Sequence, residues 1–368
     1  MQKRVLGSKT VSDMLCRKAY RSADIGGMSK TSKSPLTVAK TAYEAGKKTL
    51  PRYAHKFSRK DFTCAQLFAI LVLRKFFKTD YRGIIQYLCE WPDLRRVLDL
   101  HDKVPHFTTP QKAAAKLMND ALIRKLLTQT IDDFYPRRKS AAALDDDDLA
   151  WVVRLEQAAG DSTGFESRHC SRYFTRRRKR GKNKDEPVSY CRFPKLGVVI
   201  DCASHLILST LRGVGPKPDV DELKPMMEQM ATNVLFDQML LDAGYDSEGN
   251  HVLTRETYGI ESIIPAKAGR PTTKLPTGRW RWLMATQFDE ESYGQRWQVE
   301  TVMFMLKSRQ GESLTARSDQ ARRQEMGVMA ITHNVMIVLG AEGFYRAYPT
   351  PFHAPSTEDG GNMEHSTS

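Results

Sequence analysis

Four polar side chains in the segment 292–310 are spaced so that one helix would present them together. They are Tyr293, Arg296, Glu300 and Lys307. At about 100° per residue, these positions lie within roughly 60° of one another on the helix surface. An apolar stripe that would seat the helix on a core comprises Val299, Val302, Met303 and Leu306. One carboxylate would thus lie among a phenol and two cations. An ordinary amphipathic helix has the same spacing, so a site requires further carboxylates beside Glu300.

Two further carboxylates follow predicted strands. Asp161 comes after the apolar segment 152–159, and Asp242 comes after 238–241. Ligands gather at the carboxyl ends of strands in open α/β sheets, so the two aspartates would be neighbours if their strands lie side by side. Three converging carboxylates repel one another unless cations bind them. Two Mg²⁺ ions about 3.5–4 Å apart are the arrangement that clamps the attacking and leaving oxygens in phosphodiester cleavage. A single aspartate at a strand end is more often a cap, so the combination carries the hypothesis.

The three motifs together resemble bacterial insertion-sequence transposases of the DDE class. Residues 161–164 read DSTG, residues 240–247 read LLDAGYDS, and the helical quartet matches the Y-(2)-R-(3)-E-(6)-K signature of the cut-and-paste branch. The resemblance covers roughly residues 150–340. It implies a ribonuclease-H-like core and divalent-metal catalysis on DNA.

The resemblance also implies roles for individual residues. Asp161, Asp242 and Glu300 would be the catalytic metal ligands, holding two Mg²⁺ ions for which Mn²⁺ can substitute. Tyr293, Arg296 and Lys307 would grip the DNA end at its phosphates. Relatives act on paired ends, so the expected partners are double-stranded DNA, both transposon ends and target, and a second copy of the chain as a homodimer.

The segment 168–184, RHCSRYFTRRRKRGKNK, is strongly basic and contains no acid. A solvated loop is one interpretation. Its place in the chain close to Asp161 favours a clamp on the DNA backbone. The predicted DNA-contacting residues of this segment are Arg176, Arg177, Arg178, Lys179 and Arg180.

A second basic stretch, 265–288, interleaves cations with tryptophans. It contains Arg270, Lys274, Arg279, Arg281, Trp280 and Trp282. Aromatic rings among cations suit unpaired bases, which stack on them. Tryptophans that pack into the protein are the commoner alternative, and the same two alternatives apply to Trp297.

Length and charge agree with a DNA-acting protein. The chain has 368 residues, enough for two domains, and a net charge of +14. Such an excess favours a polyanionic partner, because neutralising phosphates and releasing their counterions is the main source of nonspecific nucleic-acid affinity.

The longest apolar run, 67–73, is too short to span a bilayer. The six cysteines show no CxxC or Cys/His spacing, so a reduced, cytoplasmic protein is expected. The resemblance implies a bacterial protein associated with the nucleoid.

The order of patterns predicts two domains. Residues 1–35 are a basic tail, 36–136 an all-helical DNA-binding domain, 137–150 a linker, 151–348 the catalytic domain and 349–368 a disordered tail. In the helical part, SRKD at 58–61 predicts a capping box, and Thr109-Pro110 predicts a helix running to about residue 127. Its basic positions, Arg74, Lys75 and Lys78 among them, are predicted to be exposed, where they suit binding to a duplex or form the solvated faces of a helical bundle.

The later part alternates strands and helices. Predicted strands are 152–159, 196–201, 206–211, 238–241 and 260–264, with helices at 219–230, from about 246 to 258, and 318–339. This order describes a mixed α/β sheet with helices on its faces. The predicted function is a DNA transposase that binds transposon ends and catalyses strand cleavage and strand transfer. The alternatives are a transposase-derived DNA-binding protein without catalysis, or a metal-dependent nuclease without strand transfer.

Overall fold

A computed structural model describes residues 31–57, 59–101, 103–135, 153–167, 169, 173–177, 187–232, 234–266 and 274–347. These residues belong to one compact unit that begins at Thr31. The predicted linker 137–150 and the predicted tail 349–368 lie outside the described residues, as does the predicted N-terminal tail up to residue 30. In the described part of the chain, no helix combines the length and the apolar character needed to span a membrane.

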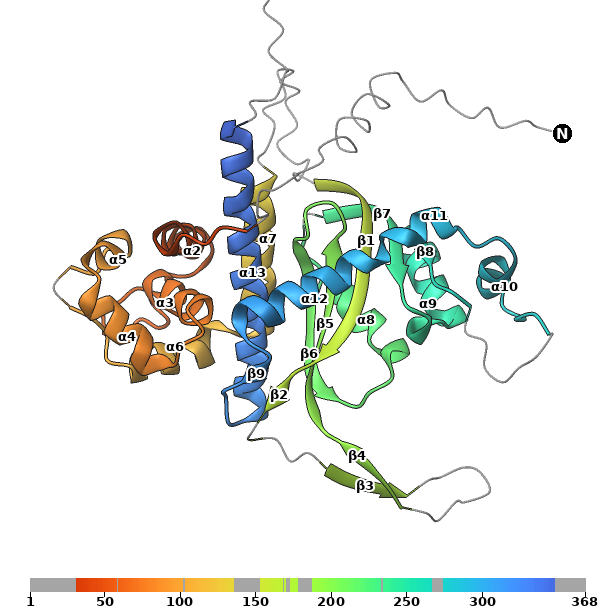
Figure 1. The fold of residues 1–368 in the computed structure, drawn as a ribbon, viewed down its shortest axis with the longest axis horizontal. Helices are drawn as coiled ribbons and strands as arrows, with labels where there is room; N and C mark the ends of the chain where they lie inside the picture. Colours follow the sequence, from red (N-terminus) through yellow and green to blue (C-terminus); the bar gives the residue numbers. More distant parts are fainter. Residues whose placement is uncertain are drawn as a thin grey trace, which may run out of the picture. The chain divides into compact units, whose positions relative to one another are not determined.

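Short helices make up the part of the chain that precedes the sheet (Figure 1). They are α2 (Pro35–Thr49), α3 (Cys64–Phe76), α4 (Tyr81–Glu90), α5 (Pro92–Val97), α6 (Thr108–Leu117) and α7 (Asp120–Phe134). Their starts are set by local chemistry: Ser34, Asp80 and Asn119 accept backbone N–H groups as N-caps of α2, α4 and α7. Pro35 and Pro92 occupy first-turn positions, where a missing N–H costs nothing.

Two helix boundaries differ from the prediction. The capping box of α3 is formed by Thr63 and Gln66 rather than by the SRKD sequence, so the helix begins at Cys64. The predicted helix from Thr109 to residue 127 is divided into α6 and α7, because the Asn119 side chain accepts the N–H of Leu122 and starts a new helix. A capping side chain competes locally with helix propagation, and apolar periodicity alone does not show this.

A five-stranded mixed sheet follows, in the order β6-β5-β1-β7-β8. Its strands are β1 (Val153–Gly164), β5 (Phe193–Asp201), β6 (Ile207–Gly215), β7 (Val234–Leu241) and β8 (Glu261–Ile263). β1 pairs antiparallel with β5 and parallel with β7, and β8 is parallel to β7. All five predicted strands are present, and the prediction of a mixed α/β fold is confirmed.

The remaining strands form small sheets outside the main one. β2 (Glu166–Ser167) pairs with β9 (Ser313–Leu314), and β3 (Tyr173–Arg177) pairs with β4 (Pro187–Cys191).

The helices between the strands are shorter than predicted. The predicted helix 219–230 is a 3₁₀ turn, η1 (Asp219–Asp221), followed by α8 (Leu223–Glu228). A second 3₁₀ turn, η2 (Ala243–Tyr245), follows β7. The helix predicted to end at 258 consists of α9 (Glu248–Val252) and a π-helical turn, η3 (Leu253–Thr257).

The last part of the fold crosses one face of the sheet. It contains α10 (Arg279–Thr286), α11 (Glu290–Tyr293), the 3₁₀ turn η4 (Gly294–Arg296), α12 (Trp297–Gln310) and α13 (Asp319–Ala347). α12 contacts β1 and β5, and Figure 1 shows it lying across the strands. The predicted stripe Val299, Val302, Met303 and Leu306 is buried, as expected.

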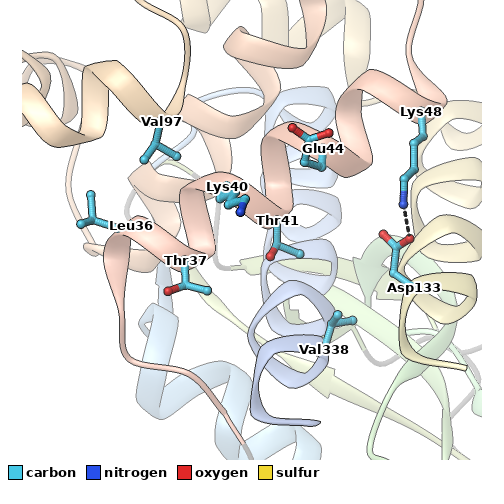
Figure 2. Close-up of a pocket in the computed structure, with 9 residues that line it drawn as sticks. All are labelled: Leu36, Thr37, Lys40, Thr41, Glu44, Lys48, Val97, Asp133 and Val338. Carbon is cyan, nitrogen blue, oxygen red and sulfur yellow. Dashed lines mark hydrogen bonds and ion pairs between the residues drawn. The ribbon is translucent and has the colours of Figure 1, made fainter. Parts of the chain in front are cut away.

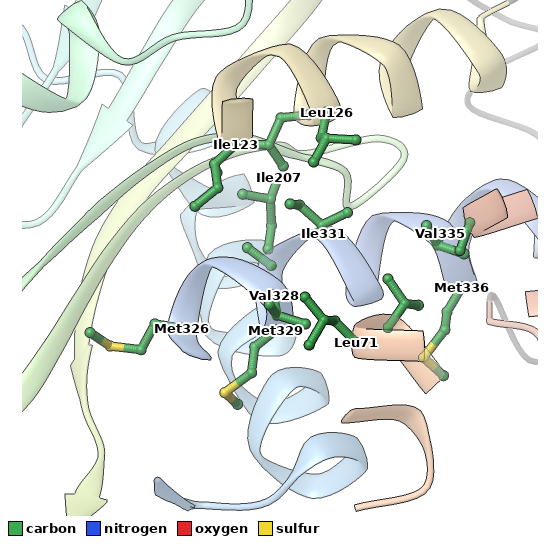
Figure 3. Close-up of a cluster of buried hydrophobic side chains, with 14 of the residues drawn as sticks. Leu71, Ile123, Leu126, Ile207, Met326, Val328, Met329, Ile331, Val335 and Met336 are labelled. Carbon is green, nitrogen blue, oxygen red and sulfur yellow. The ribbon is translucent and has the colours of Figure 1, made fainter. Parts of the chain in front are cut away.

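One hydrophobic cluster joins the helical part to the sheet. Figure 3 shows side chains of α13, including Met329 and Val335, among Leu71 of α3, Ile123 of α7 and Ile207 of β6. A second cluster lies on the other face of the sheet, where Met226 of α8 packs. The α13 helix therefore forms part of the core for both the helical part and the sheet, and it fixes the surface on which α12 rests.

Candidate active site

Asp161 and Asp242 lie at the same end of neighbouring parallel strands. In the β1–β7 ladder Gly160 is paired with Leu241, so the two aspartates follow directly from paired positions. The carboxylates are close enough for the charge on Asp242 to raise the pKa of Asp161. The sequence-based expectation that these two residues are neighbours is met by the strand order.

The environment of Asp161 favours its neutral form. Burial raises the pKa of the Asp161 carboxyl, although the N–H of Ser162, which donates to Oδ1 at 2.7 Å, and the guanidinium of Arg296 act in the opposite direction. Asp242 and Asp219 raise this pKa further. A bound cation would stabilise the charged form of a carboxyl that is partly buried and close to other acids.

Arg296 is the cation that connects two of the predicted acids. Its guanidinium lies 3.7 Å from Oδ2 of Asp161 and 2.5 Å from Oε1 of Glu300. The Glu300 side chain is 57% exposed, so its carboxylate is turned toward Arg296 and solvent. The predicted quartet is not on one uninterrupted helix, because Tyr293 ends α11 and Arg296 ends the 3₁₀ turn η4. This turn contacts both β1 and β7, which brings Arg296 to the aspartates.

Tyr293 and Lys307 lie on either side of this pair along the chain. The Tyr293 ring packs edge-on against Phe288, with centroids 5.0 Å apart, and the Arg296 guanidinium lies over it at 5.9 Å. The ammonium of Lys307 lies 5.7 Å from the ring of Phe165, the residue that follows β1. Both side chains are partly buried, which limits their freedom.

The far end of α12 is held by other parts of the fold. Lys78 donates to the carbonyl of Ser308 at 2.7 Å, and the buried side-chain amide of Gln310 donates to the carbonyl of Met329 in α13. Near its start, the ring of His205 bonds to Gln298 at 2.6 Å. These contacts from three separate regions fix where Glu300 stands over the sheet.

Across the described residues, no group of three or more His, Cys, Asp or Glu side chains is gathered so as to hold a metal ion. The Glu300 carboxylate is instead paired with Arg296. The three acids and the three companion side chains nevertheless occupy one region, which extends from the ends of β1 and β7 to α12.

The basic segment 168–184 is only partly described. Arg176 and Arg177 lie in β3, whose backbone pairs with β4, so part of the predicted loop is one strand of a two-stranded sheet. Arg178, Lys179 and Arg180 lie outside the described residues. The proposed role of this segment in DNA contact stays a prediction.

The tryptophan-containing segment has internal partners for several of its predicted DNA-binding groups. Trp280 Nε1 donates to Glu256 at 2.9 Å, and its ring is covered by the guanidinium groups of Arg255 and Arg279. Arg281 forms a bidentate pair with the buried Asp246. Both tryptophans lie in α10 rather than in a loop, and the packing alternative fits Trp280. Trp282 and Trp297 are 44% and 54% exposed, which leaves their rings accessible.

Two basic residues predicted to be exposed are buried. Arg74 and Lys75 are only 4% and 5% exposed, and both pair with the buried Glu325 of α13. The prediction of a duplex-facing surface is wrong for these two positions. Their charges serve the contact between α3 and α13.

A cavity of about 560 Å³ lies among α2, α5, α7 and α13. Figure 2 shows its lining, which mixes Leu36 and Val338 with polar groups such as Lys40, and the ion pair of Lys48 with Asp133 at 2.7 Å. None of the six predicted site residues Asp161, Asp242, Tyr293, Arg296, Glu300 and Lys307 lines it. Its polar groups are exposed or half-buried, so the cavity does not supply the buried, converging groups of an active site.

Sequence reasoning missed a buried ionic group directly behind Asp161. The ammonium of Lys195 in β5 bonds to Asp219 at 2.6 Å and to Glu222 at 3.0 Å. A lysine at the start of an otherwise apolar strand was the available signal, because lysine is seldom fully buried without a partner.

Two aspartates at the ends of neighbouring parallel strands, with an arginine and a glutamate brought over them, define an acidic site on a mixed α/β sheet. Residues 161–335 match the family described as the Transposase DDE domain. The match begins at Asp161 and includes Asp242 and Glu300. The match supports a DDE transposase domain at residues 161–335, and proteins of this family generally use divalent metals and act on DNA. A search of curated proteins found no match.

Proposed function

We propose that this protein binds transposon ends and catalyses metal-dependent cleavage and strand transfer of DNA during transposition of an insertion sequence. The observation that carries the proposal is the placement of Asp161 and Asp242 at adjacent strand ends, with Arg296 between Asp161 and Glu300, inside the region that matches the family. The strand order, three antiparallel strands followed by two parallel ones, supports a ribonuclease-H-like core.

The donor set suits divalent cations with oxygen ligands. Asp161, Asp242 and Glu300 would hold two Mg²⁺ ions, or Mn²⁺ in their place. Burial raises the pKa of Asp161, and Asp242 and Asp219 raise it further, so a bound cation would stabilise its charged form. When bound, the ions would lower the pKa of a nucleophilic water or 3′ hydroxyl and stabilise charge on the phosphate. No covalent bond between protein and DNA is required.

The companion side chains have roles that follow from their charge and position. Arg296 pairs with both Asp161 and Glu300, and it can exchange one of these partners for a DNA phosphate that arrives beside them. Lys307, further along α12 and beside Phe165, is placed for a second phosphate. The phenol of Tyr293, anchored by its ring, is available as a hydrogen-bond donor. Together these groups would grip the cleaved end of the transposon.

The helical part is proposed to recognise the transposon end, with two copies of the chain acting on paired ends. The division of labour between residues 36–136 and 151–348 stays a prediction. Because both parts contribute to one hydrophobic cluster, tests of this division require substitutions in the full chain rather than separated fragments.

Two alternatives differ in what they require of the site. A DNA-binding protein derived from a transposase would be expected to have lost one of its acids, and all three are present here. A nuclease without strand transfer would keep the same acids, so only the products distinguish it.

The deciding experiment uses the full chain and a labelled duplex that carries the terminal inverted repeat flanking its gene. With Mg²⁺ and a supercoiled target, we expect nicks that free the 3′ hydroxyl at the repeat, and then labelled strands joined to the target. A scrambled repeat is the control. Cleavage without joined products would favour the nuclease, and binding without cleavage in Mg²⁺ or Mn²⁺ would favour the non-catalytic protein.

A further inference from the structure

Behind Asp161, on the opposite face of the sheet, lies a group of polar side chains that the proposed reaction does not use. We call it the Lys195 cluster, and it comprises Ser162, Lys195, Asp219 and Glu222. The side chains of Lys195 and Glu222 are 8% and 9% exposed, and that of Asp219 is 34% exposed. The Lys195 ammonium donates to both carboxylates and also to the carbonyl of Lys217 at 2.9 Å. All three of its protons therefore have acceptors.

Ser162 links this cluster to the catalytic face. Successive strand residues face opposite sides of a sheet, and here Ala158 packs in the cluster on the α8 side whereas Ala159 packs on the α12 side. Asp161 therefore faces α12, and Ser162 faces α8. The Ser162 hydroxyl donates to Oδ1 of Asp219 at 2.8 Å, while its backbone N–H donates to Oδ1 of Asp161 at 2.7 Å. One residue thus connects Asp219 to the carboxylate of Asp161.

Asp219 also lies against the turn that follows the second aspartate. The turns η1, which holds Asp219, and η2, which follows Asp242, are in contact. A Cβ atom placed on Gly244 would lie 3.1 Å from Oδ2 of Asp219, so the glycine allows this close approach. One carboxylate oxygen of Asp219 therefore holds the chain after Asp161, and the other borders the chain after Asp242.

The cluster consists of charged and polar groups, and this suggests a role other than stabilising the fold. Apolar side chains of similar volume often stabilise a buried position as well as an ion pair does. Hydrogen bonds from an ammonium are directional, whereas apolar packing is not. They therefore fix the position of each acceptor oxygen. Such directional contacts are suited to holding two strand ends in register.

We propose that Asp219, held by Lys195, is a positioning residue that sets the placement of Asp161 relative to Asp242. This inference rests on the proposed function, because it assumes that these two aspartates act together on a metal ion. Asp219 itself touches neither DNA nor metal in this role. Its effect passes through Ser162 on one side and through the η2 turn on the other.

The most direct test uses a pair of substitutions at Ser162 in the full chain. Ser162→Ala removes the hydroxyl that reaches Asp219, and Ser162→Thr retains a hydroxyl at the same position. Loss of a residue that orients metal ligands typically costs about 10- to 100-fold in metal affinity or activity. We expect Ser162→Ala to lower the kcat for end cleavage about 10-fold with little change in the KM for DNA, and Ser162→Thr to restore it.

Asp219→Ala should have a larger effect of the same kind. The matched control is Asp221→Ala, since Asp221 lies in the same turn and is exposed. The second readout is Mn²⁺ binding to the assembled protein–DNA complex, measured from the signal of free Mn²⁺ by electron paramagnetic resonance. We expect weaker Mn²⁺ binding in Ser162→Ala and Asp219→Ala, and unchanged binding in Ser162→Thr and Asp221→Ala.

The outcomes separate this proposal from the proposed function. If Asp161→Asn abolishes cleavage but Ser162→Ala and Asp219→Ala cleave and bind Mn²⁺ like the wild type, the positioning role is overturned and the function stands. If Asp161→Asn leaves cleavage intact, the proposed function itself fails. A purely structural role predicts a lower melting temperature, but normal kcat and normal Mn²⁺ affinity at temperatures well below the melting temperature. This result would also overturn the proposal. Should Asp219→Ala fail to fold, the Ser162 pair still decides.

Discussion

Lys75 in α3 donates a hydrogen bond to Glu325 in α13, a residue 250 positions further along the chain. Glu325 also accepts the backbone N–H groups of Thr315 and Ala316, and Arg74 lies 3.8 Å from it. Burial raises the pKa of Glu325, but the neighbouring cations and hydrogen bonds outweigh it and lower the pKa overall. The ionised carboxylate thus joins the helical part of the chain to the segment that follows α12.

Glu325→Gln should destabilise the protein strongly. It leaves two buried cations without their counter-charge, and breaking a buried pair in this way typically costs about 3–5 kcal/mol. Urea unfolding at neutral pH measures the loss, with the exposed Glu312→Gln as the control. A second removal, Lys75→Met in the Glu325→Gln background, should recover part of the stability. A loss below about 1 kcal/mol for Glu325→Gln would show that the cluster is solvated.

His333 should make the fold less stable in mild acid. It is 1% exposed, its Nε2 bonds to the carbonyl of His205 at 2.9 Å, and burial lowers its pKa from 6.5 to about 4. Below pH 6.5 the unfolded chain binds a proton that the folded chain does not, so stability falls as the pH decreases toward 4. Between pH 7 and pH 5 this contributes about 2 kcal/mol of lost stability.

The comparison that isolates this effect is between the wild type and His333→Gln, which does not titrate. Urea titrations at pH 7 and pH 5 measure how much the unfolding free energy falls between these two pH values. This fall should be about 2 kcal/mol smaller for the variant than for the wild type. If the unfolding free energies of the two proteins fell equally between pH 7 and pH 5, His333 would have the same pKa in the folded chain as in the unfolded chain.

Asp161→Asn, Asp242→Asn and Glu300→Gln should each abolish cleavage, as should removal of divalent metal with EDTA. None of the three side chains is fully buried, so thermal stability should change little. For Asp161 the raised pKa means that loss of its charge does not weaken the fold. The control is Glu291→Gln on the exposed α11. Near-normal cleavage by one variant would remove that residue from the site.

Arg296→Ala and Lys307→Ala should weaken binding of the transposon end. Each lost phosphate contact reduces the slope of log affinity against log salt by about one unit. Gel-shift titrations at several salt concentrations measure this slope. Arg154→Ala, near the opposite end of β1 and paired with Asp237, is the control and should leave it unchanged. Unchanged slopes for both site variants would make the two cations ordinary surface charges.

Much of the architecture was predictable because it depends on local patterns. Alternating and continuous apolar runs predicted the five strands, and the apolar stripe of α12 predicted the face that is buried. The candidate acids were found because Asp161 and Asp242 each end such a run, and strand ends are where sheets gather ligands. These signals lie within a few residues of the features they predict.

Contacts between distant segments were decided only by the tertiary structure. Arg74 and Lys75 are adjacent basic residues of the kind found on exposed helix faces. They are nevertheless buried, because Glu325 of α13 pairs with both of them. Lys195 similarly meets Asp219 and Glu222 only because β5 and η1 lie together. Arg296 and Glu300 pair at the i,i+4 spacing that helical periodicity indicates, but the approach of Arg296 to Asp161 depends on the contact of the turn η4 with β1 and β7. A charged residue has the same sequence signal in water and in a buried pair, so its role depends on the partner that folding brings to it.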